Sequence, residues 1–267
     1  MTTGMNQSEM VRLHCKTLRL PTLAAALAES MRCAERDNWP LDAFLAHLLE
    51  QEVAARQQRR IERLRLESKL PPGKTFAVFD EGRLPLRIRR QLPYLQAGDF
   101  VSRAENVLCF GLPGTGKTHL AAAIGHALVE NGRSVLFTPT FKLVGRLLRA
   151  KQEYELEREL RRLDRFEVVI LDDIGYVQQS REEMEVLFTF LSERYERHSL
   201  VITSNLVFSE WDKIFKDPLT TAAAIDRVVC NQVAHSIIIE FGRDIQSMRM
   251  EEAQRSQAAL RPEVGVG

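Results

Sequence analysis

One eight-residue run constrains the fold of this chain more than any other feature. An apolar segment at residues 106–110 leads into the sequence GLPGTGKT, and the helix-forming stretch HLAAAIGHAL follows it. Glycines in such a loop let successive backbone N–H groups turn toward one anion, and the following helix N-terminus adds partial positive charge. Strand, glycine-rich loop and helix together are typical of a loop that cradles a polyphosphate. The predicted nucleotide-binding residues are Gly111, Leu112, Pro113, Gly114, Thr115, Gly116, Lys117 and Thr118.

Two side chains at the end of this loop have predicted roles of their own. Lys117 is expected to reach the β- and γ-phosphates, and the Thr118 hydroxyl is expected to bind Mg²⁺. A chance glycine turn is the alternative, but eight matching residues with the correct flanks argue against it. ATP and Mg²⁺ are therefore the expected cofactors.

A pair of acids follows a second apolar run. Residues 168–171 read Val-Val-Ile-Leu, which is typical of a buried strand, and Asp172 and Asp173 come directly after them. Ligands of open α/β sheets bind at the carboxyl ends of the strands. We expect Asp172 to hold Mg²⁺ and Asp173 to polarise the attacking water, since a site that only binds nucleotide does not need a second acid. A solvated turn is the alternative interpretation.

Short β-rich runs alternate with helical patterns in the rest of this region. The expected strands are residues 106–110, 134–138, 167–171, 200–204 and 236–240, and the helical patterns are residues 117–131, 140–163 and 181–197. Such alternation predicts an α/β fold in which helices cover both faces of a five-stranded parallel sheet. The first 68 residues differ, because apolar residues recur there at three- and four-residue steps, with a break at Pro21. Pro71-Pro72 ends the helical pattern shortly after this region. The first 68 residues therefore predict a small helical module.

Composition narrows the class of protein. The net charge is +1, with 45% hydrophobic and 27% charged residues, which is ordinary for a globular chain. Four scattered cysteines favour neither zinc nor disulfides. No signal peptide is evident and no apolar run approaches the about 18 residues that span a bilayer. We expect a cytoplasmic protein that does not associate with a membrane.

Basic residues concentrate in two regions. Residues 56–90 contain eleven Lys and Arg against four acids, a local charge of +7, and helical spacing predicts one basic face formed by Arg56, Arg59, Arg60 and Arg63. A second face, in residues 142–165, is predicted from Lys142, Arg146 and Arg149. Such stripes suit a phosphate backbone without base readout. Solvated surface with ordinary i,i+4 ion pairs is the alternative for both.

Four elements in this order, GLPGTGKT, VVILDD, VITSN and AAAIDRVV, resemble the AAA+ P-loop ATPases. Further stretches, LRLPTLAAALAE, EQEVAARQQRRIERLR and TSNLVFSEWDKIF, resemble the IstB-type transposition helper ATPases of bacterial insertion sequences, which are related to DnaC-type helicase loaders. The resemblance implies that Asn205 senses the γ-phosphate. It also implies that Arg227 is an arginine finger acting in trans within a homo-oligomer. Without the resemblance, an Asn after a strand is most often a turn residue, and Arg227 beside its acidic neighbour suits a surface ion pair.

The resemblance also implies a domain plan. We expect a helical DNA-binding or oligomerisation module at residues 1–68, a linker and start of the ATPase domain at 69–104, an AAA+ ATPase domain at 105–255, and a flexible tail at 256–267. Asp173 replaces the Glu of many AAA+ proteins, and Arg249 is the one candidate for a second sensor arginine. Phe76 and Phe79 are candidates either for adenine stacking or for core packing.

The implied function is an ATPase that oligomerises on duplex DNA and assists a partner transposase. Two alternatives share its chemistry in part. A helicase loader would prefer single strands and bind a helicase, and an ATP-switched architectural DNA-binding protein would not depend on turnover. A small-molecule kinase leaves Asn205 and Arg227 without roles.

Overall fold

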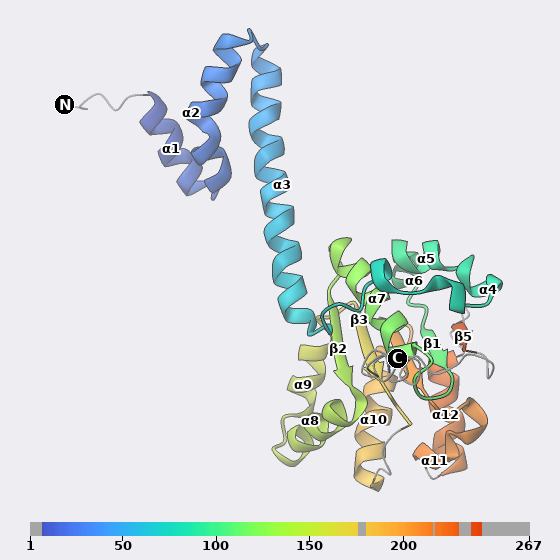
Figure 1. Ribbon diagram of the computed structural model, residues 1–267. Coiled ribbons are helices and arrows are strands. Elements are labelled where there is room, and N and C mark those ends of the chain that lie inside the picture. Colours follow the sequence, from blue (N-terminus) through green and yellow to red (C-terminus); the bar gives the residue numbers. More distant parts are fainter. Residues whose placement is uncertain (1–6, 176–179, 216, 230–235, 242–267) are drawn as a thin grey trace, which may run out of the picture. The chain divides into compact units, whose positions relative to one another are not determined.

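The computed structural model of this 267-residue chain describes residues 7–175, 180–215, 217–229 and 236–241 (Figure 1). The chain divides into two compact units, Met1–Arg63 and Leu64–Gly267. The tail and the candidate sensor Arg249 lie outside the described residues. In the described ranges, no helix combines the length and the apolar character that crossing a membrane requires.

The N-terminal unit is helical. Its helices are α1 (Gln7–Thr17), α2 (Pro21–Arg36) and α3 (Leu41–Ser68), the last of which continues beyond the boundary between the units. Pro21 begins α2, where its missing N–H costs no helical hydrogen bond. A small core holds the three helices together, with buried residues Cys15, Leu23, Leu27 and Leu48.

A buried carboxylate fixes α2 to α3 in this unit. Glu52 is 2% exposed and accepts hydrogen bonds from the N–H groups of Thr22 (2.8 Å) and Leu23 (3.0 Å), in the first turn of α2. Arg56 donates to the same carboxylate at 2.9 Å. Burial raises the pKa of Glu52, but the Leu23 and Thr22 amides and the Arg56 guanidinium outweigh it, so the pKa lies below its ordinary value.

The second unit is built on a parallel sheet of five strands. In chain order they are β1 (Val107–Phe110), β2 (Val135–Pro139), β3 (Val168–Asp172), β4 (Ser199–Ser204) and β5 (Ile237–Glu240). Their spatial order is β2-β3-β4-β1-β5, and every pairing is parallel. The predicted α/β fold class and all five strands are confirmed. This order places β4 between β1 and β3, so the loops after these three strands are neighbours.

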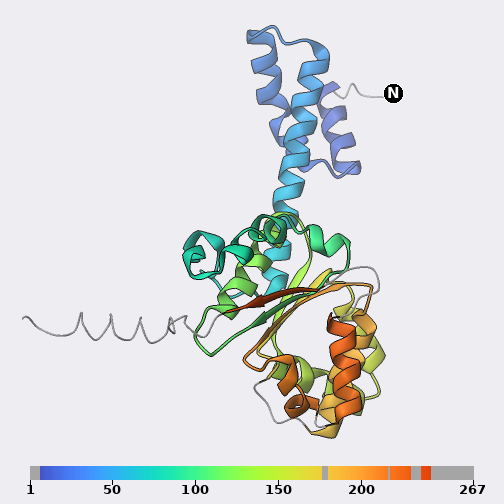
Figure 2. The same cartoon turned by 90° about the vertical axis from the view of Figure 1, so that its right-hand side faces the viewer.

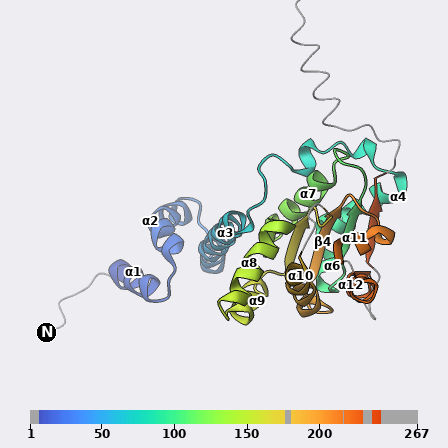
Figure 3. The ribbon, with the colours of Figure 1, turned by 90° about the horizontal axis from the view of Figure 1, so that it is seen from below.

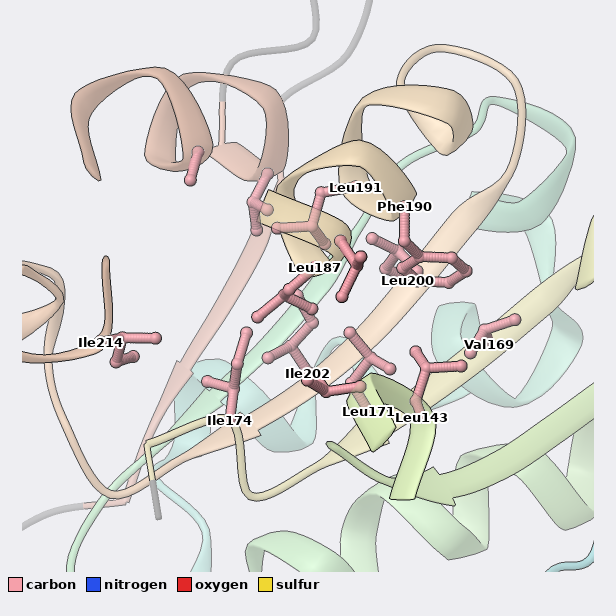
Figure 4. Packing of buried hydrophobic residues seen from close by; sticks show 14 of the residues in the cluster. Leu143, Val169, Leu171, Ile174, Leu187, Phe190, Leu191, Leu200, Ile202 and Ile214 are labelled. Carbon is pink, nitrogen blue, oxygen red and sulfur yellow. The ribbon is translucent and has the colours of Figure 1, made fainter. Parts of the chain in front are cut away.

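Helices cover both faces of the sheet, as continuous apolar strands require. One face carries α7 (Lys117–Glu130), and the opposite face carries α8 (Thr140–Gln152), α10 (Arg181–Arg194) and α12 (Pro218–Val229) (Figures 2 and 3). A large core lies between the sheet and α8, α10 and α12, where Val169, Leu171 and Ile202 of the strands meet Leu187 and Leu191 of α10 (Figure 4). The short helices η3 (Phe208–Glu210) and α11 (Asp212–Phe215) border this core.

The chain between α3 and β1 is ordered into short helices. They are η1 (Phe76–Val78), η2 (Glu81–Arg83), α4 (Leu86–Arg89), α5 (Leu92–Ala97) and α6 (Asp99–Ser102). Buried apolar residues anchor them, among them Leu95 and Phe100, both 0% exposed. This segment, which we expected to be partly linker, packs within the second unit.

One expected helix is wrong in its extent. The pattern at residues 140–163 predicted continuous helix, but α8 ends at Gln152 and α9 (Leu156–Leu163) begins four residues later. Tyr154 has φ 58° and is 98% exposed, so no apolar contact keeps the helix continuous there. The N–H of Glu155 closes the turn on the Ala150 carbonyl at 2.7 Å. A helical hairpin therefore replaces one long helix.

Candidate active site

The glycine-rich loop leaves the buried strand β1 and ends at the first residue of α7. Gly114 (φ 83°) and Gly116 (φ 104°) adopt positive φ angles that L side chains rarely reach. Gly111 is required for another reason, because a Cβ there would lie 2.7 Å from the Cβ of Phe241. Lys117 is 8% exposed, and its ammonium donates to the carbonyls of Gly111 (2.7 Å) and Leu112 (2.8 Å). The loop and the helix N-terminus thus have the conformation expected of a phosphate cradle, and phosphate binding by these residues stays a prediction.

Oxygen ligands suited to a hard cation meet beside this cradle. The Thr118 hydroxyl, in the first turn of α7, donates to Oδ1 of Asp172 at 2.8 Å. A hydroxyl and a carboxylate fit Mg²⁺, which is commonly held by few protein oxygens together with water and phosphate. No cluster of three or more His, Cys, Asp or Glu side chains that could hold a metal occurs among the described residues. The residues present therefore fit Mg²⁺ bound together with a nucleotide.

Thr203 of β4 makes contacts at this site that the sequence did not predict. Its hydroxyl donates to the same Oδ1 of Asp172 at 2.7 Å and accepts the N–H of Asp173 at 2.8 Å. Asp173 has φ 62°, so the chain turns sharply directly after β3. The run VITSN gave no signal for this residue, because only the pairing of β4 with β3 brings the two strand ends together.

Asn205 follows β4 at the same edge of the sheet. Its amide oxygen is buried and accepts no hydrogen bond from the described part of the chain. Gly175 lies against it, since a Cβ on this glycine would be 2.6 Å from that oxygen. The predicted role of Asn205 stays a prediction. The structure brings its strand end next to those carrying the glycine-rich loop and the acids.

Arg227 lies near the C-terminal end of α12, on the face of the sheet that α10 also covers. Its guanidinium lies over the Phe188 ring at 5.0 Å from the centroid, and Nη1 donates to the Ala223 carbonyl at 3.2 Å. These contacts are with α10 and with its own helix. The geometry leaves the predicted role in a neighbouring subunit untested.

The two aromatic candidates before the core have different environments. Phe79 is buried and its ring packs edge-on against His119 of α7 at 5.2 Å, whereas Phe76 is half-buried. His119 also contacts the Thr75 carbonyl at 3.2 Å, and burial lowers the pKa of its imidazole. Phe79 therefore anchors this segment to the first turns of α7, which was the core-packing alternative. Adenine stacking by Phe76 stays a prediction.

The predicted basic face of α3 is exposed, but two of its arginines are partly neutralised. Arg56 and Arg59 lie 2.9 and 3.4 Å from the Glu52 carboxylate, and Arg56 also donates to the Arg19 carbonyl. Arg60 and Arg63 are exposed farther along the same helix. The positive charge available to a ligand on this face is thus smaller than the count of arginines suggested.

The second predicted basic face is divided by the hairpin of α8 and α9. Arg146 pairs with Glu159 of α9 at 2.6 Å, Lys142 lies near the Phe141 ring, and Arg149 is exposed without an ion pair among the described residues. Arg146 and Arg149, but not Lys142, line a cavity of about 590 Å³ between the two helices. Its other charged lining residues are Glu153, Glu155, Arg158, Glu159, Arg161, Arg162 and Arg165.

Comparison with known proteins identifies the family of this chain. The model of the family "IstB-like ATP binding protein" matches residues 13–257. The chain belongs to this family. An insertion sequence ATP-binding protein of Sinorhizobium fredii is 44% identical to this IstB-like chain over 241 residues, which are 90% of this chain and 79% of the relative. The insertion sequence IS5376 ATP-binding protein of Geobacillus stearothermophilus is 34% identical over 249 residues, 93% and 99% of the two chains.

Solved structures place the IstB-like chain in the AAA+ P-loop fold. A DNA replication initiation factor matches with a TM-score of 0.55 at 16% identity, over 74% of this chain and 58% of that one. The DnaI structure matches with a TM-score of 0.51 at 21% identity, over 66% and 96%. At such identities the likeness supports the fold alone, and the predicted AAA+ fold and IstB resemblance are confirmed.

Proposed function

We propose that this chain is a Mg²⁺-dependent ATPase that assembles on duplex DNA as a homo-oligomer and assists a partner transposase. The observation that carries the proposal is the junction of three strand ends, where Thr118 and Asp172 are in contact and Asp173 follows directly. The relatives named as insertion sequence ATP-binding proteins support the choice of partner. The likeness to a replication initiation factor supports the fold alone and not the choice of reaction or partner.

Each residue of the site has a definite task in this proposal. The loop amides and Lys117 bind the phosphates, while Thr118 and Asp172 hold Mg²⁺, which offsets negative charge on the phosphates when bound. Asp173 accepts a proton from the attacking water, and Asn205 orients that water. Arg227 enters the site of a neighbouring subunit, so hydrolysis requires head-to-tail assembly.

Hydrolysis with and without DNA tests this function. Steady-state ATP hydrolysis is measured without DNA, with single-stranded DNA and with duplex, and Lys117→Ala serves as the blank. We expect strong stimulation by duplex, because assembly on DNA brings Arg227 to a neighbour's site. Stimulation by single strands alone would favour a helicase loader. If neither single-stranded nor duplex DNA changes the rate of hydrolysis, the proposed coupling of assembly to DNA is wrong.

The cavity between α8 and α9 supports a phosphate-binding surface. Six arginines and three glutamates line it, which leaves a net charge of +3. Ion pairs neutralise part of this set, since Arg158 lies 3.0 Å from Glu155 and Arg146 lies 2.6 Å from Glu159. Arg149 and Arg165 have no such ion pair among the residues described, and Arg149, which the sequence predicted as a DNA contact, is the one of the two to test.

We expect Arg149→Ala to weaken duplex binding uniformly across sequences. The slope of log K against the logarithm of the salt concentration should become less steep by about 1. The reason is that a phosphate contact releases counterions without reading bases. Fluorescence anisotropy over a salt series measures the slope. Arg103→Ala is the matched control, because Arg103 is exposed and its guanidinium lies 3.9 Å from Glu105. An unchanged slope for Arg149→Ala would show that this face is only solvated.

A further inference from the structure

Thr203 interacts with three consecutive residues at the end of β3. The side chain is 1% exposed, and its hydroxyl contacts Asp172 Oδ1 (2.7 Å) and the Asp173 N–H (2.8 Å). Its carbonyl accepts the N–H of Ile174 at 3.0 Å. One residue of β4 therefore contacts both acids and the residue that follows them.

The direction of these hydrogen bonds is fixed by chemistry. A backbone N–H can only donate, so the Thr203 oxygen accepts from Asp173 and its single proton is given to Asp172. Asp172 Oδ1 also accepts the Thr118 proton. Two hydroxyls, one from α7 and one from β4, thus hold the same carboxylate oxygen.

The contact with Asp173 replaces regular sheet pairing. The register of β3 with β4 ends at Leu171 and Ile202, one residue before Asp172 and Thr203. In an extended strand, adjacent side chains point to opposite faces, so two consecutive acids would diverge. The turn at Asp173, with φ 62°, ends that alternation. A left-handed conformation is unfavourable for a non-glycine residue, and the hydrogen bond from the Asp173 N–H to the Thr203 hydroxyl offsets this cost.

We propose that Thr203 is a positioning residue for both acids: it orients the Asp172 carboxylate toward the Mg²⁺ site and holds Asp173 in the turn from which it meets the attacking water. This inference rests on the proposed ATPase function. Thr203 itself touches neither nucleotide nor metal in this role. Outer partners of metal ligands commonly change affinity or activity by about 10- to 100-fold when they are removed.

Three variants separate positioning from packing. Thr203→Val keeps the shape and β-propensity of the side chain but removes both hydrogen bonds, whereas Thr203→Ser keeps the hydroxyl. Ser199→Ala is the matched control, because Ser199 is a fully buried hydroxyl residue at the other end of the same strand. Thermal unfolding is measured for each variant. Thr203→Cys, which keeps a small side chain with a weaker donor, takes the place of Thr203→Val if the latter does not fold.

We expect Thr203→Val to lower kcat about 10- to 100-fold and to raise the Mg²⁺ concentration for half-maximal rate, with the KM for ATP within about threefold of wild type. Thr203→Ser restores most of the rate, and Ser199→Ala matches wild type. If Thr203→Cys takes the place of Thr203→Val, its rate is lower than that of Thr203→Ser, because a thiol is a weaker donor than a hydroxyl, and equal rates in the two variants overturn the inference. The inference is overturned if Thr203→Val keeps the wild-type rate and Mg²⁺ dependence, or if the Ser variant falls as far as Val.

Failure of this inference is distinguishable from failure of the proposed function. A wild-type protein that binds ATP but does not hydrolyse it would overturn the ATPase proposal. The Mg²⁺ dependence of ATP affinity, measured by calorimetry, would then still test Thr203. Loss of that dependence in Thr203→Val but not in Thr203→Ser supports positioning of Asp172, and equal dependence in both overturns it.

Discussion

Arg227→Ala is expected to lower kcat for ATP hydrolysis by about 10³-fold or more while ATP binding is kept. An arginine finger stabilises charge that develops in the transition state, so its loss affects turnover far more than ground-state affinity. Within its own chain the guanidinium lies over the Phe188 ring of α10, and it donates to Ala223 of α12. The measurement compares kcat from steady-state hydrolysis with Kd from nucleotide titration. The control is Arg197→Ala, which removes an exposed arginine paired with Asp164 at 2.6 Å.

A mixing experiment decides whether the arginine acts in trans. Arg227→Ala subunits keep an intact nucleotide site, and Lys117→Ala subunits keep an intact arginine. In a head-to-tail assembly, mixing the two inactive variants places wild-type Arg227 against wild-type loops, so hydrolysis returns in part. If Arg227 acted within its own subunit, no mixture would recover activity. Equal hydrolysis by Arg227→Ala alone and by wild type would remove this arginine from the mechanism.

The features that could be predicted from the sequence depend on residues close together in the chain. The loop at residues 111–118 has its strand before it and its helix after it, so local pattern and glycine chemistry identify it. The same holds for the acids after Val168–Leu171, because four apolar residues suffice to indicate a buried strand. Parallel order follows from strand and helix alternation. These parts of the fold are confirmed.

The features that the sequence did not predict depend on contacts between segments that lie far apart in the chain. Thr203 contacts Asp172 only because β4 lies between β1 and β3, an order that periodicity does not reveal. Glu52 is a buried cap for the first turn of α2, thirty residues earlier, and so Arg56 and Arg59 were counted as available charge. The turn at Tyr154 was missed because apolar periodicity resumes in α9.

The second large effect is expected from Lys117→Ala, which should weaken ATP binding by about 100-fold or more. Charge-assisted hydrogen bonds to phosphate contribute about 1.5–3 kcal/mol each, and Lys117 is expected to make contacts with two phosphates. The ammonium also donates to the Gly111 and Leu112 carbonyls, so the substitution removes contacts that shape the loop itself. Loss of binding could therefore come from lost charge or from a distorted loop.

Thermal unfolding separates these two causes. At ATP concentrations about 100 times Kd, ligand stabilises the wild-type fold by about 2.7 kcal/mol, and a 100-fold weaker variant gains only about 0.4 kcal/mol. For a unit of this size about 1 kcal/mol corresponds to 2–4 °C, so a nucleotide shift of several degrees falls to about one. If lost charge is the cause, the nucleotide-free Tm of Lys117→Ala stays within a few degrees of wild type, and Lys117→Arg keeps part of the nucleotide shift.

If a distorted loop is the cause, the nucleotide-free Tm of Lys117→Ala falls further, and Lys117→Arg loses the nucleotide shift as completely as Lys117→Ala does. Lys151→Ala, which removes a lysine paired with Glu185 on the surface, should keep the full nucleotide shift. An undiminished shift in Lys117→Ala would exclude the glycine-rich loop as the nucleotide site.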